Sequence, residues 1–208
     1  MDLCFLDLET TGFEPKEDSI IEISFVRFKD GKEVAKYDQV IRPDKSPLND
    51  FVSHLTGITQ EELDSAGKDL EPEKAQIREL IGESVIVGHN IDFDIRFLVG
   101  NGIDISKNPR LDTHELSRIL LPLEASFALE VLSEKYGFIH KDAHRAMSDV
   151  WASKDLFELL LEKIEQLPID YLASIKDFLS AKTDWYAKEL FLRAAGVEHS
   201  DFYQKENF

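Results

Sequence analysis

The first strand-like segment of the chain carries two carboxylates on one face. Residues 3–8 are apolar except for Asp7, and Glu9 follows directly, so we predict a buried central strand over residues 2–8. Side chains alternate between the faces of a strand, which places Asp7 and Glu9 on the same side. Two neighbouring carboxylates repel each other, and one would take up a proton unless a cation compensates them. The pair therefore predicts a divalent metal ion, and Gly12 leaves room for a ligand to approach.

Two more strand-like segments complete an antiparallel meander. Residues 19–28 are rich in β-branched and aromatic residues, and residues 33–42 return after a turn with Asp30-Gly31 at its centre. Pro43 ends the third segment, because proline cannot donate to a strand ladder. We therefore expect three antiparallel strands at the start of the fold.

Strands and helices alternate in the next part of the chain. Short helices are expected over residues 49–82, one of them starting at the capping box Thr59-Gln60-Glu61-Glu62. Residues 84–88 and 110–112 are predicted to be short strands, the first of them parallel. Apolar patterns predict further helices over residues 92–100, about 112–121, 126–136 and 145–165. This order predicts an α/β fold with a five-stranded mixed sheet, its first three strands antiparallel, flanked by helices.

The C-terminal part of the chain has a different pattern. A boundary is predicted near Pro168, which divides the chain into a domain of residues 1–166 and a helical C-terminal extension of residues 167–208. The expected parts of this extension are two amphipathic helices and a loose polar tail, at residues 171–181, 184–195 and 198–208. The helices either pack on the domain or form a docking or linker segment toward another domain or subunit.

Composition limits the classes of function. The formal net charge is −17, which argues against a generic nucleic-acid-binding protein because such proteins are usually basic. Bound divalent cations would nevertheless concentrate positive charge in one cleft. The chain has a single cysteine, Cys4, no secretory signal and no apolar run of about 18 residues, so we expect a cytoplasmic protein that does not enter a membrane.

A second acidic motif follows the predicted strand at residues 84–88. In the segment His89-Asn90-Ile91-Asp92-Phe93-Asp94, the last aspartate falls in the first turn of the next helix. The helix dipole and the free amides of that turn favour an ionised carboxylate. Asp92 or Asp94 could instead serve only to cap the helix.

A third motif pairs His144 with Asp149. Five residues on an ideal helix rotate by about 500°, which leaves the two side chains roughly 140° apart. They can therefore share one site only if His144 lies before the helix, on the loop that leads to it. Such a position suits a general base rather than a rigid metal ligand. The alternative is a surface histidine and a solvated aspartate.

Other polar residues fit structural roles. Asp112 is predicted to cap the helix that follows it, because aspartate is a favourable N-cap residue. The remaining histidines are expected to be structural or to lie at the surface; they are His54, His114, His140 and His199.

The three motifs together resemble those of the DEDDh family of 3′→5′ exonucleases. In family order they are Asp7-Leu8-Glu9-Thr10-Thr11-Gly12, the segment from His89 to Asp94, and His144-Arg145-Ala146-Met147-Ser148-Asp149. Residues 54–59 are also similar to that family. The resemblance covers residues 1–165 and implies a ribonuclease H-like fold, in agreement with the sheet predicted from the pattern.

The resemblance implies hydrolysis of phosphodiester bonds at the 3′ end of a single-stranded nucleic acid, with DNA favoured and two divalent cations, Mg²⁺ or Mn²⁺, as cofactors. Asp7 would bridge the two ions, Glu9 and Asp149 would hold the ion that carries the attacking water, and Asp94 would serve the other ion. His144 would take the proton from that water, because histidine titrates near neutral pH.

The resemblance also implies contacts to the terminal nucleotide, from Thr10, Thr11, Gly12, Asn90 and Phe93. It leaves the biological context open between a proofreading subunit, the exonuclease part of a helicase, and a free-standing trimming enzyme. The acidic surface and the C-terminal helices favour delivery of the substrate by a polymerase or helicase partner, or by a tethered domain.

Three alternatives remain. An RNA-trimming exonuclease of the same family would carry the same motifs, because contacts to the sugar run largely through backbone groups and pocket shape. An inactive nucleic-acid-binding scaffold would bind no metal stoichiometrically, although all four acids and the histidine are present. A phosphatase of the haloacid dehalogenase type also begins with an acidic strand motif, but it requires aspartate in place of Glu9 and a late Asp-Asp pair that the chain lacks.

Overall fold

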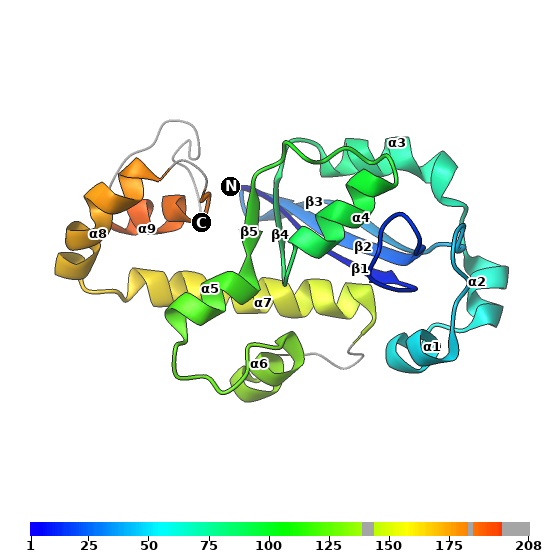
Figure 1. Cartoon of the computed structure of the whole chain (residues 1–208). Coiled ribbons are helices and arrows are strands. Elements are labelled where there is room, and N and C mark those ends of the chain that lie inside the picture. The colour runs from blue at the N-terminus through cyan, green and yellow to red at the C-terminus, as the bar shows by residue number, and fades with distance from the viewer. Residues whose placement is uncertain (139–143, 183–184, 197–208) are drawn as a thin grey trace.

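The computed structural model describes residues 1–138, 144–182 and 185–196. Its centre is a five-stranded mixed sheet with the strand order β3-β2-β1-β4-β5. The strands are β1 (Asp2–Thr10), β2 (Ile20–Lys29), β3 (Lys32–Val40), β4 (Val85–Gly88) and β5 (Arg110–Asp112). Strands β1 to β3 pair antiparallel, and β4 pairs parallel with both β1 and β5, which confirms the predicted sheet (Figure 1).

The end of β1 differs from the predicted one in a way that bears on the site. The strand continues to Thr10, so Glu9 stays within the ladder, directly opposite Glu22 of β2. The register shifts between Glu9 and Thr10. Such an irregularity re-aims the backbone at the point where the pairing ends, immediately after the second carboxylate.

The β2–β3 hairpin turns at Asp30 and Gly31, as predicted. Their φ angles are 51° and 74°, which is the left-handed backbone that a two-residue hairpin turn requires. Strand β3 then ends at Val40 rather than at residue 42, because Ile41 pairs with Lys68 in an isolated parallel bridge.

Helices cover both faces of the sheet (Figure 1). They are α1 (Asp50–Thr56), α2 (Gln60–Ala66), α3 (Leu70–Ile81), α4 (Asp92–Gly100), α5 (Thr113–Leu120), α6 (Leu129–Tyr136), α7 (Ala146–Glu165), α8 (Ile169–Ala181) and α9 (Lys188–Ala194). The predicted capping box begins α2, where the Thr59 hydroxyl accepts a hydrogen bond of 3.1 Å from the Glu62 N–H. Helix α4 ends at the first of the two glycines proposed for it, Gly100.

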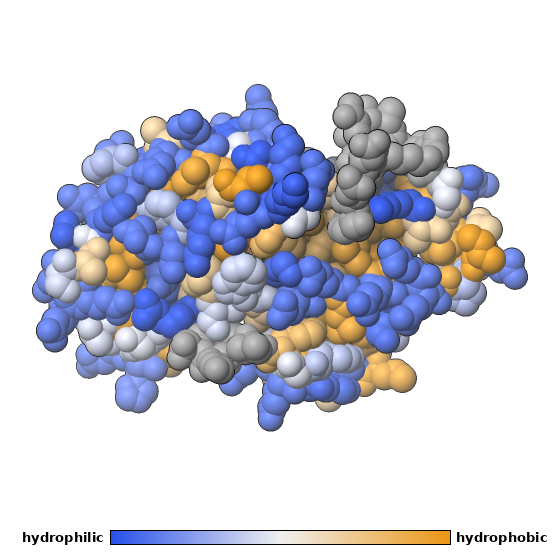
Figure 2. Space-filling view, turned by 180° about the vertical axis from the view of Figure 1, so that it is seen from behind, coloured by the Kyte–Doolittle hydropathy of each residue, from blue (hydrophilic) through white to orange (hydrophobic). Residues whose placement is uncertain are grey.

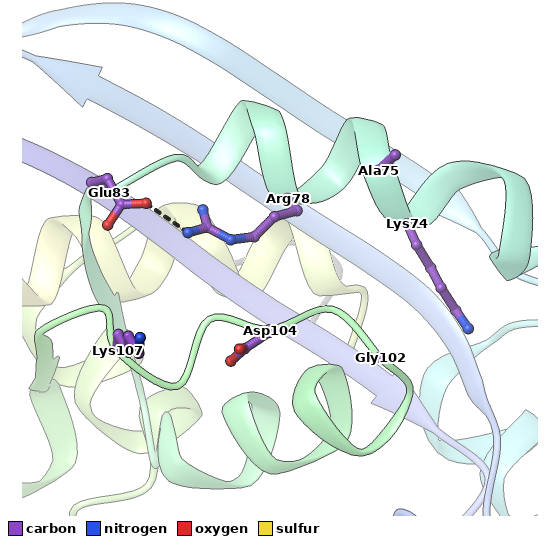
Figure 3. Close-up of a pocket in the computed structure, with 7 residues that line it drawn as sticks. All are labelled: Lys74, Ala75, Arg78, Glu83, Gly102, Asp104 and Lys107. Atoms are coloured by element: carbon purple, nitrogen blue, oxygen red, sulfur yellow. Dashed lines mark hydrogen bonds and ion pairs between the residues drawn. The ribbon is translucent and has the colours of Figure 1, made fainter.

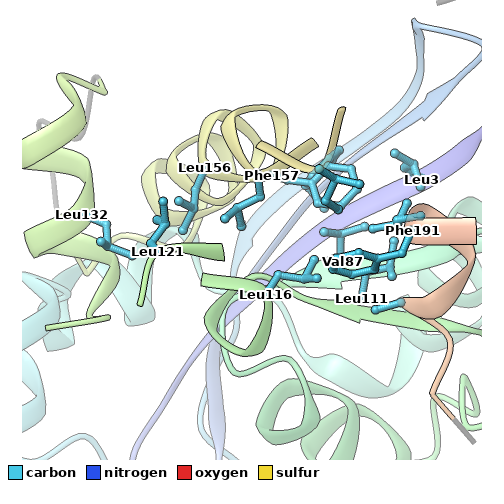
Figure 4. Close-up of a cluster of buried hydrophobic side chains, with 14 of the residues drawn as sticks. Leu3, Val87, Leu111, Leu116, Leu121, Leu132, Leu156, Phe157 and Phe191 are labelled. Carbon is cyan, nitrogen blue, oxygen red and sulfur yellow. The ribbon is translucent and has the colours of Figure 1, made fainter. Parts of the chain in front are cut away.

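Side chains of β1 enter a different apolar cluster on each face of the sheet. Leu3 and Phe5 face α7, where the rings of Phe5 and Phe157 meet edge to face at 5.8 Å between centroids. Leu3, Val87 and Phe157 belong to this cluster (Figure 4). The even-numbered side chains of the strand join the cluster with α3 and α4 on the other face. Because side chains alternate, Asp7 and Glu9 continue the row of Leu3 and Phe5 and point toward α7.

The C-terminal helices pack beyond the end of α7 that lies far from His144 (Figure 1). Their buried residues belong to the cluster that also contains Leu160 and Ile164 of α7; they are Leu172, Leu179, Leu190, Phe191 and Leu192. The packing role of these helices is therefore visible, whereas a docking role and a domain division at residue 166 remain predictions. Residue 184, the tail at 198–208, His140 and His199 lie outside the described residues.

The surface is mostly hydrophilic on the face shown in Figure 2, in keeping with the formal net charge of −17. Helix α8 nevertheless exposes three large apolar side chains, Ile169, Tyr171 and Phe178. Among the described residues, none of the helices combines the length and the apolar character that a membrane crossing requires.

Candidate functional site

The candidate site forms where the end of β1 meets the start of α7. Asp7 and Glu9 point toward α7, and the first turn of that helix carries Asp149. One ligand atom from each of Glu9, His144 and Asp149 lies within 4.8 Å of the other two. This spacing is close to that of ligands around a single metal ion. Residues separated by more than 130 positions in the sequence are thus brought to one point.

His144 lies before the helix, as its spacing from Asp149 predicted. Helix α7 begins at Ala146 with Arg145 at the N-cap position, and His144 has a left-handed φ of 64°. This backbone is uncommon for a residue other than glycine and depends on support from neighbouring groups. It turns the chain just ahead of α7, so that the imidazole reaches Glu9 and Asp149.

Asp94 reaches the site from α4, on the other side of β1. Its Oδ1 accepts a hydrogen bond of 3.0 Å from the N–H of Leu8, the residue between Asp7 and Glu9. Only 4% of Asp94 is exposed. The N-cap position of α4 is held by Ile91, with no side-chain cap bond, and Asp92 instead forms an ion pair with Arg110. Neither aspartate is therefore the N-cap residue of α4.

The expected ionisation of Asp94 needs correction. Hydrogen bonds from its own backbone amide, in the first turn of α4, and from the Leu8 amide of β1 lower its pKa. Burial outweighs them, and the charges of Asp112 and Asp149 add to it, so the pKa of Asp94 is raised well above its usual value. The helix start alone does not keep this carboxylate ionised.

The carboxylates of β1 are affected in the same direction. Burial, followed by the charges of Asp94, Asp149 and Glu9, raises the pKa of Asp7 well above its usual value. Burial and the charge of Asp149 raise the pKa of Glu9 to about 9, although Arg145 opposes this. Such surroundings favour the protonated form of a carboxyl group unless a cation compensates its charge. Their hard oxygen atoms suit Mg²⁺ or Mn²⁺, so the residues present fit the implied metal ions.

The predicted nucleotide-contacting loop, residues 10–12, is braced by its own polar groups. The Thr10 hydroxyl donates to the Gly12 carbonyl at 2.6 Å. Thr11 is buried, and its hydroxyl is engaged by the Ser19 N–H and by Ser46. A Cβ at Gly12 would collide with the carboxylate of Asp18. The side chains of Thr10 and Thr11 thus stabilise the loop.

Asn90 and the residues beside it form a second braced loop. Asn90 has a left-handed φ of 63°, and its N–H donates to Asp112 Oδ1 at 3.1 Å. The same oxygen accepts from the His114 N–H at 2.8 Å, which confirms the predicted cap of α5. His89 is held between Thr113 Oγ1 and the Phe127 carbonyl. Burial lowers the pKa of His89 to about 4, so this histidine is a neutral structural residue.

Phe93 has an aromatic neighbour that the sequence analysis did not single out. Phe13 follows the glycine of the first motif and is 78% exposed. Its ring meets that of Phe93 edge to face, with 6.3 Å between centroids. A large aromatic ring held at the surface next to Phe93, the residue that precedes Asp94, is a suitable platform for a nucleobase. The sequence feature that could have indicated Phe13 is its position directly after Gly12, but the exposure of its side chain cannot be predicted from a single sequence.

Arg145 and Glu22 were also missed. Glu22 is 2% exposed and lies opposite Glu9 in the β1–β2 ladder. Arg145 donates hydrogen bonds to both of its carboxylate oxygens, at distances from 2.7 to 3.3 Å. The sequence feature that could have indicated this pair is Glu22, a charged residue within an apolar strand-like segment. A charged residue needs a partner when it is buried.

A pocket of about 600 Å³ lies elsewhere, between α3 and the loop that follows α4 (Figure 3). It is lined by Lys74, Arg78, Lys107 and Asp104, among others. Arg78 is paired there with Glu83, which precedes β4, whereas Asp94 follows that strand. The pocket therefore lies at the other end of β4 from the carboxylates and contains none of the predicted site residues.

Comparisons with known proteins agree with the three motifs. Residues 4–157 match the RNase T family, described as exonucleases. A DNA polymerase III of the PolC type from Latilactobacillus sakei is 41% identical over 147 residues, which are 69% of this chain and 10% of that protein. The 3′-5′ exonuclease DinG of Bacillus subtilis is 34% identical over 176 residues, or 82% of this chain and 19% of that protein. The chain thus spans between a tenth and a fifth of the length of these relatives.

Solved structures show the same fold. Exonuclease I of E. coli, in complex with a dT13 oligonucleotide, superposes with a TM-score of 0.70 at 24% identity, over 88% of this chain and 46% of that one. Exonuclease X, in complex with 5′ overhanging duplex DNA, gives a TM-score of 0.61 at 23% identity, over 77% of this chain and 91% of that one. The sheet order, the three motifs and the family match agree with one another. The chain belongs to the RNase T family of exonucleases, within the DEDDh group of ribonuclease H-like proteins.

Proposed function

We propose that this chain is a 3′→5′ exonuclease domain that hydrolyses phosphodiester bonds at the 3′ end of single-stranded DNA and releases nucleoside 5′-monophosphates. The observation that carries the proposal is the meeting of Glu9, His144 and Asp149 within 4.8 Å, together with the half-buried Asp7 and the buried Asp94. Family membership supplies the reaction class.

The four carboxylates, Asp7, Glu9, Asp94 and Asp149, would hold two divalent cations, Mg²⁺ or Mn²⁺. When bound, such ions supply Lewis-acid chemistry, which makes a water nucleophilic and stabilises negative charge on the leaving oxygen. The raised pKa values of Asp7, Glu9 and Asp94 support this role, because they mark a site in which negative charge lacks sufficient compensation.

His144 would act as the general base. Its imidazole lies beside Glu9 and Asp149, although His144 itself precedes α7 and is not part of the helix. A ring nitrogen in this place can take the proton from the attacking water and pass it to solvent. The role needs a group that gains and loses a proton in each cycle, and histidine meets that need near neutral pH.

The terminal nucleotide would lie against the two braced loops. Its base would stack on the exposed ring of Phe13, which Phe93 supports from the side. Its sugar and phosphate would approach the backbone of residues 10–12, which the hydrogen bonds of the Thr10 and Thr11 hydroxyls hold in place. Asn90 would border the same place from the loop after β4.

DNA is the favoured substrate. Exonuclease I and exonuclease X are described in complex with DNA, and the PolC-type relatives are DNA polymerases. RNA is the second candidate, because the matching family carries the name RNase T.

A polymerase, a helicase or a tethered domain would deliver the substrate. The relatives of the PolC and DinG types are five to ten times longer than the matched segment, judged from the 19% and 10% that it covers. A chain with a formal net charge of −17 also lacks the basic surface that long nucleic acids require for tight binding.

The test is degradation of matched DNA and RNA single strands, labelled at either the 3′ or the 5′ end, with Mg²⁺ or Mn²⁺. We expect immediate release of the 3′ label as a mononucleotide, and gradual shortening of the strand that carries the 5′ label. Faster degradation of the RNA strand than of the DNA strand would identify RNA, instead of DNA, as the substrate. Intact strands under all conditions, together with no stoichiometric Mn²⁺ binding in calorimetry, would favour the inactive scaffold.

A further inference from the structure

Glu22 is a buried carboxylate that none of the proposed catalytic steps uses. It lies on β2, on the same face as Glu9, and points toward the start of α7. Arg145 donates to it from Nη2 at 2.7 Å and from Nε at 3.1 Å, and the Ala146 N–H donates at 2.8 Å. The carboxylate therefore binds the first residues of α7 through both a side chain and the backbone.

These contacts replace an ordinary helix cap. Arg145 occupies the N-cap position of α7 but has no side-chain cap bond of its own. Glu22 instead provides the acceptor that the first amides of a helix require, and its negative charge suits the helix N-terminus. Arg145 also donates from Nη2 to Glu62 of α2 at 3.0 Å. One guanidinium thus connects β2, α2 and the start of α7.

His144 depends on this anchor more than Asp149 does. Asp149 lies within a 20-residue helix whose buried side chains, such as Val150 and Phe157, fix its position. His144 lies outside the helix and has a left-handed backbone, directly before the anchored residue. We propose that Arg145 and Glu22 are positioning residues, which hold His144 against Glu9 and Asp149 in the orientation that a general base needs. This inference rests on the proposed exonuclease function.

The chain contains a matched control at the opposite end of the same two strands. Arg27 of β2 forms a forked pair with Asp2 of β1, with two hydrogen bonds of 2.7 Å. The side chains of Arg27 and Asp2 are 18% and 30% exposed. This pair joins β1 to β2 but lies far along the strands from the carboxylates at residues 7 and 9. Its loss should weaken the fold without moving His144.

The experiment compares Arg145→Met with Arg27→Met, measuring kcat and KM on a 3′-labelled DNA strand, Mn²⁺ stoichiometry and Tm. We expect Arg145→Met to lower kcat by about 10- to 100-fold, because small misplacements of a catalytic group cost that much. KM and Mn²⁺ stoichiometry should change little. Arg27→Met should lower Tm but leave kcat near the wild-type value. Arg145→Lys should lose less kcat than Arg145→Met, since lysine keeps the charge but not the fork.

A second comparison separates positioning from general damage. If Arg145 acts through His144, Arg145→Met should cause less than about twofold further loss in a His144→Ala background, because coupled residues are not additive. Three results would overturn this inference but not the proposed function. They are additive losses of kcat in the double variant, a wild-type kcat in Arg145→Met, and an equal loss of kcat in Arg27→Met. If Arg145→Met does not fold, Arg145→Lys and Glu22→Gln decide by the same criteria. An inactive wild-type chain would overturn the proposed function and this inference with it.

Discussion

The two ends of β1 both carry carboxylates, but their surroundings differ. At the start of the strand, Arg27 donates to both oxygens of Asp2 at 2.7 Å. At its other end, Asp7 lies among acidic groups, and each of the main influences on its pKa raises it. The first carboxylate is balanced by a cation of the protein itself. Under the proposed function, metal ions from outside the chain balance the second, which would distinguish a pair that serves the fold from a group that serves a reaction.

The fold tolerates the unbalanced end because the rest of β1 is well packed. Leu6 is fully buried, and Leu8 is 5% exposed, on the face opposite the carboxylates. Phe5 packs on Phe157 on the face that the carboxylates share. Apolar burial of this kind stabilises by about 1.5–3 kcal/mol for each large side chain, enough to offset a few strained acidic groups. The strand therefore combines a stable core with the proposed metal site.

Replacement of Asp7 by asparagine should have the largest effect on activity. Asp7→Asn keeps the shape of the side chain but removes one ligand charge from the site, so we expect hydrolysis to fall to the background of the assay. The matched change Asp2→Asn should leave kcat near the wild-type value, because its carboxylate serves only the pair with Arg27. Release of a 3′ label with Mn²⁺ measures both. Near-full activity of a folded Asp7→Asn protein would refute the assignment of this end of β1 as the metal site.

Replacement of His144 should have the next largest effect. His144→Ala removes the general base but none of the four carboxylates, so we expect the rate to fall by about 10²–10⁴-fold. Calorimetric titration should still show Mn²⁺ binding with unchanged stoichiometry. Loss of metal binding together with activity would instead identify His144 as a metal ligand.

The central part of this arrangement was predictable from local patterns. The two-residue period of a strand placed Asp7 and Glu9 on one face. The helical rotation between His144 and Asp149 required the histidine to lie before the helix if the two were to share a site. The Asp30-Gly31 turn and the capping box at Thr59 marked element boundaries for equally local reasons. Each of these inferences needs only neighbours in the sequence.

The supporting contacts could not be predicted, because they join residues far apart in the chain. The bond from Leu8 to Asp94 spans 86 residues, and the ion pair of Arg145 with Glu22 spans 123. The pKa of Asp94 also departed from expectation, since burial is a property of the packed structure and not of the helix start. Exposure of Phe13 is another property that only packing determines.

Substitution of Phe13 should have a moderate effect confined to substrate binding. Phe13→Ser removes the exposed ring beside Phe93, and loss of one base-stacking contact costs about 1–3 kcal/mol, or roughly 5- to 150-fold in affinity. We expect a higher KM with little change in kcat under saturating substrate. Phe178→Ser is the matched control, because Phe178 is 65% exposed on α8, beyond the far end of α7. Equal KM values for both variants and the wild type would show that Phe13 does not contact the substrate.

The smallest effect is one of stability, and its sign distinguishes the two ends of β1. Glu9, with a pKa raised to about 9, holds a proton in the folded chain that it releases on unfolding above pH 5, and Asp7 and Asp94 are shifted in the same direction. The folded state therefore binds more protons than the unfolded state, and the free energy of unfolding in EDTA should fall as pH rises, by up to about 1.4 kcal/mol per unit for each such proton.

Urea unfolding between pH 7 and 8 measures how the free energy of unfolding changes with pH. This window lies above the range in which His89, with a pKa lowered to about 4, would contribute with the opposite sign. It lies below the range in which Cys4, whose pKa burial raises to about 12, would add a slope of the same sign. Asp7→Asn should flatten the slope and stabilise the metal-free chain at pH 8, whereas Asp2→Asn should leave the slope unchanged and stabilise nothing. Saturating Mn²⁺ should stabilise the wild type more at pH 8 than at pH 7, because metal binding displaces the same protons. A slope near zero in EDTA for the wild type would mean that these carboxylates are already compensated without a metal.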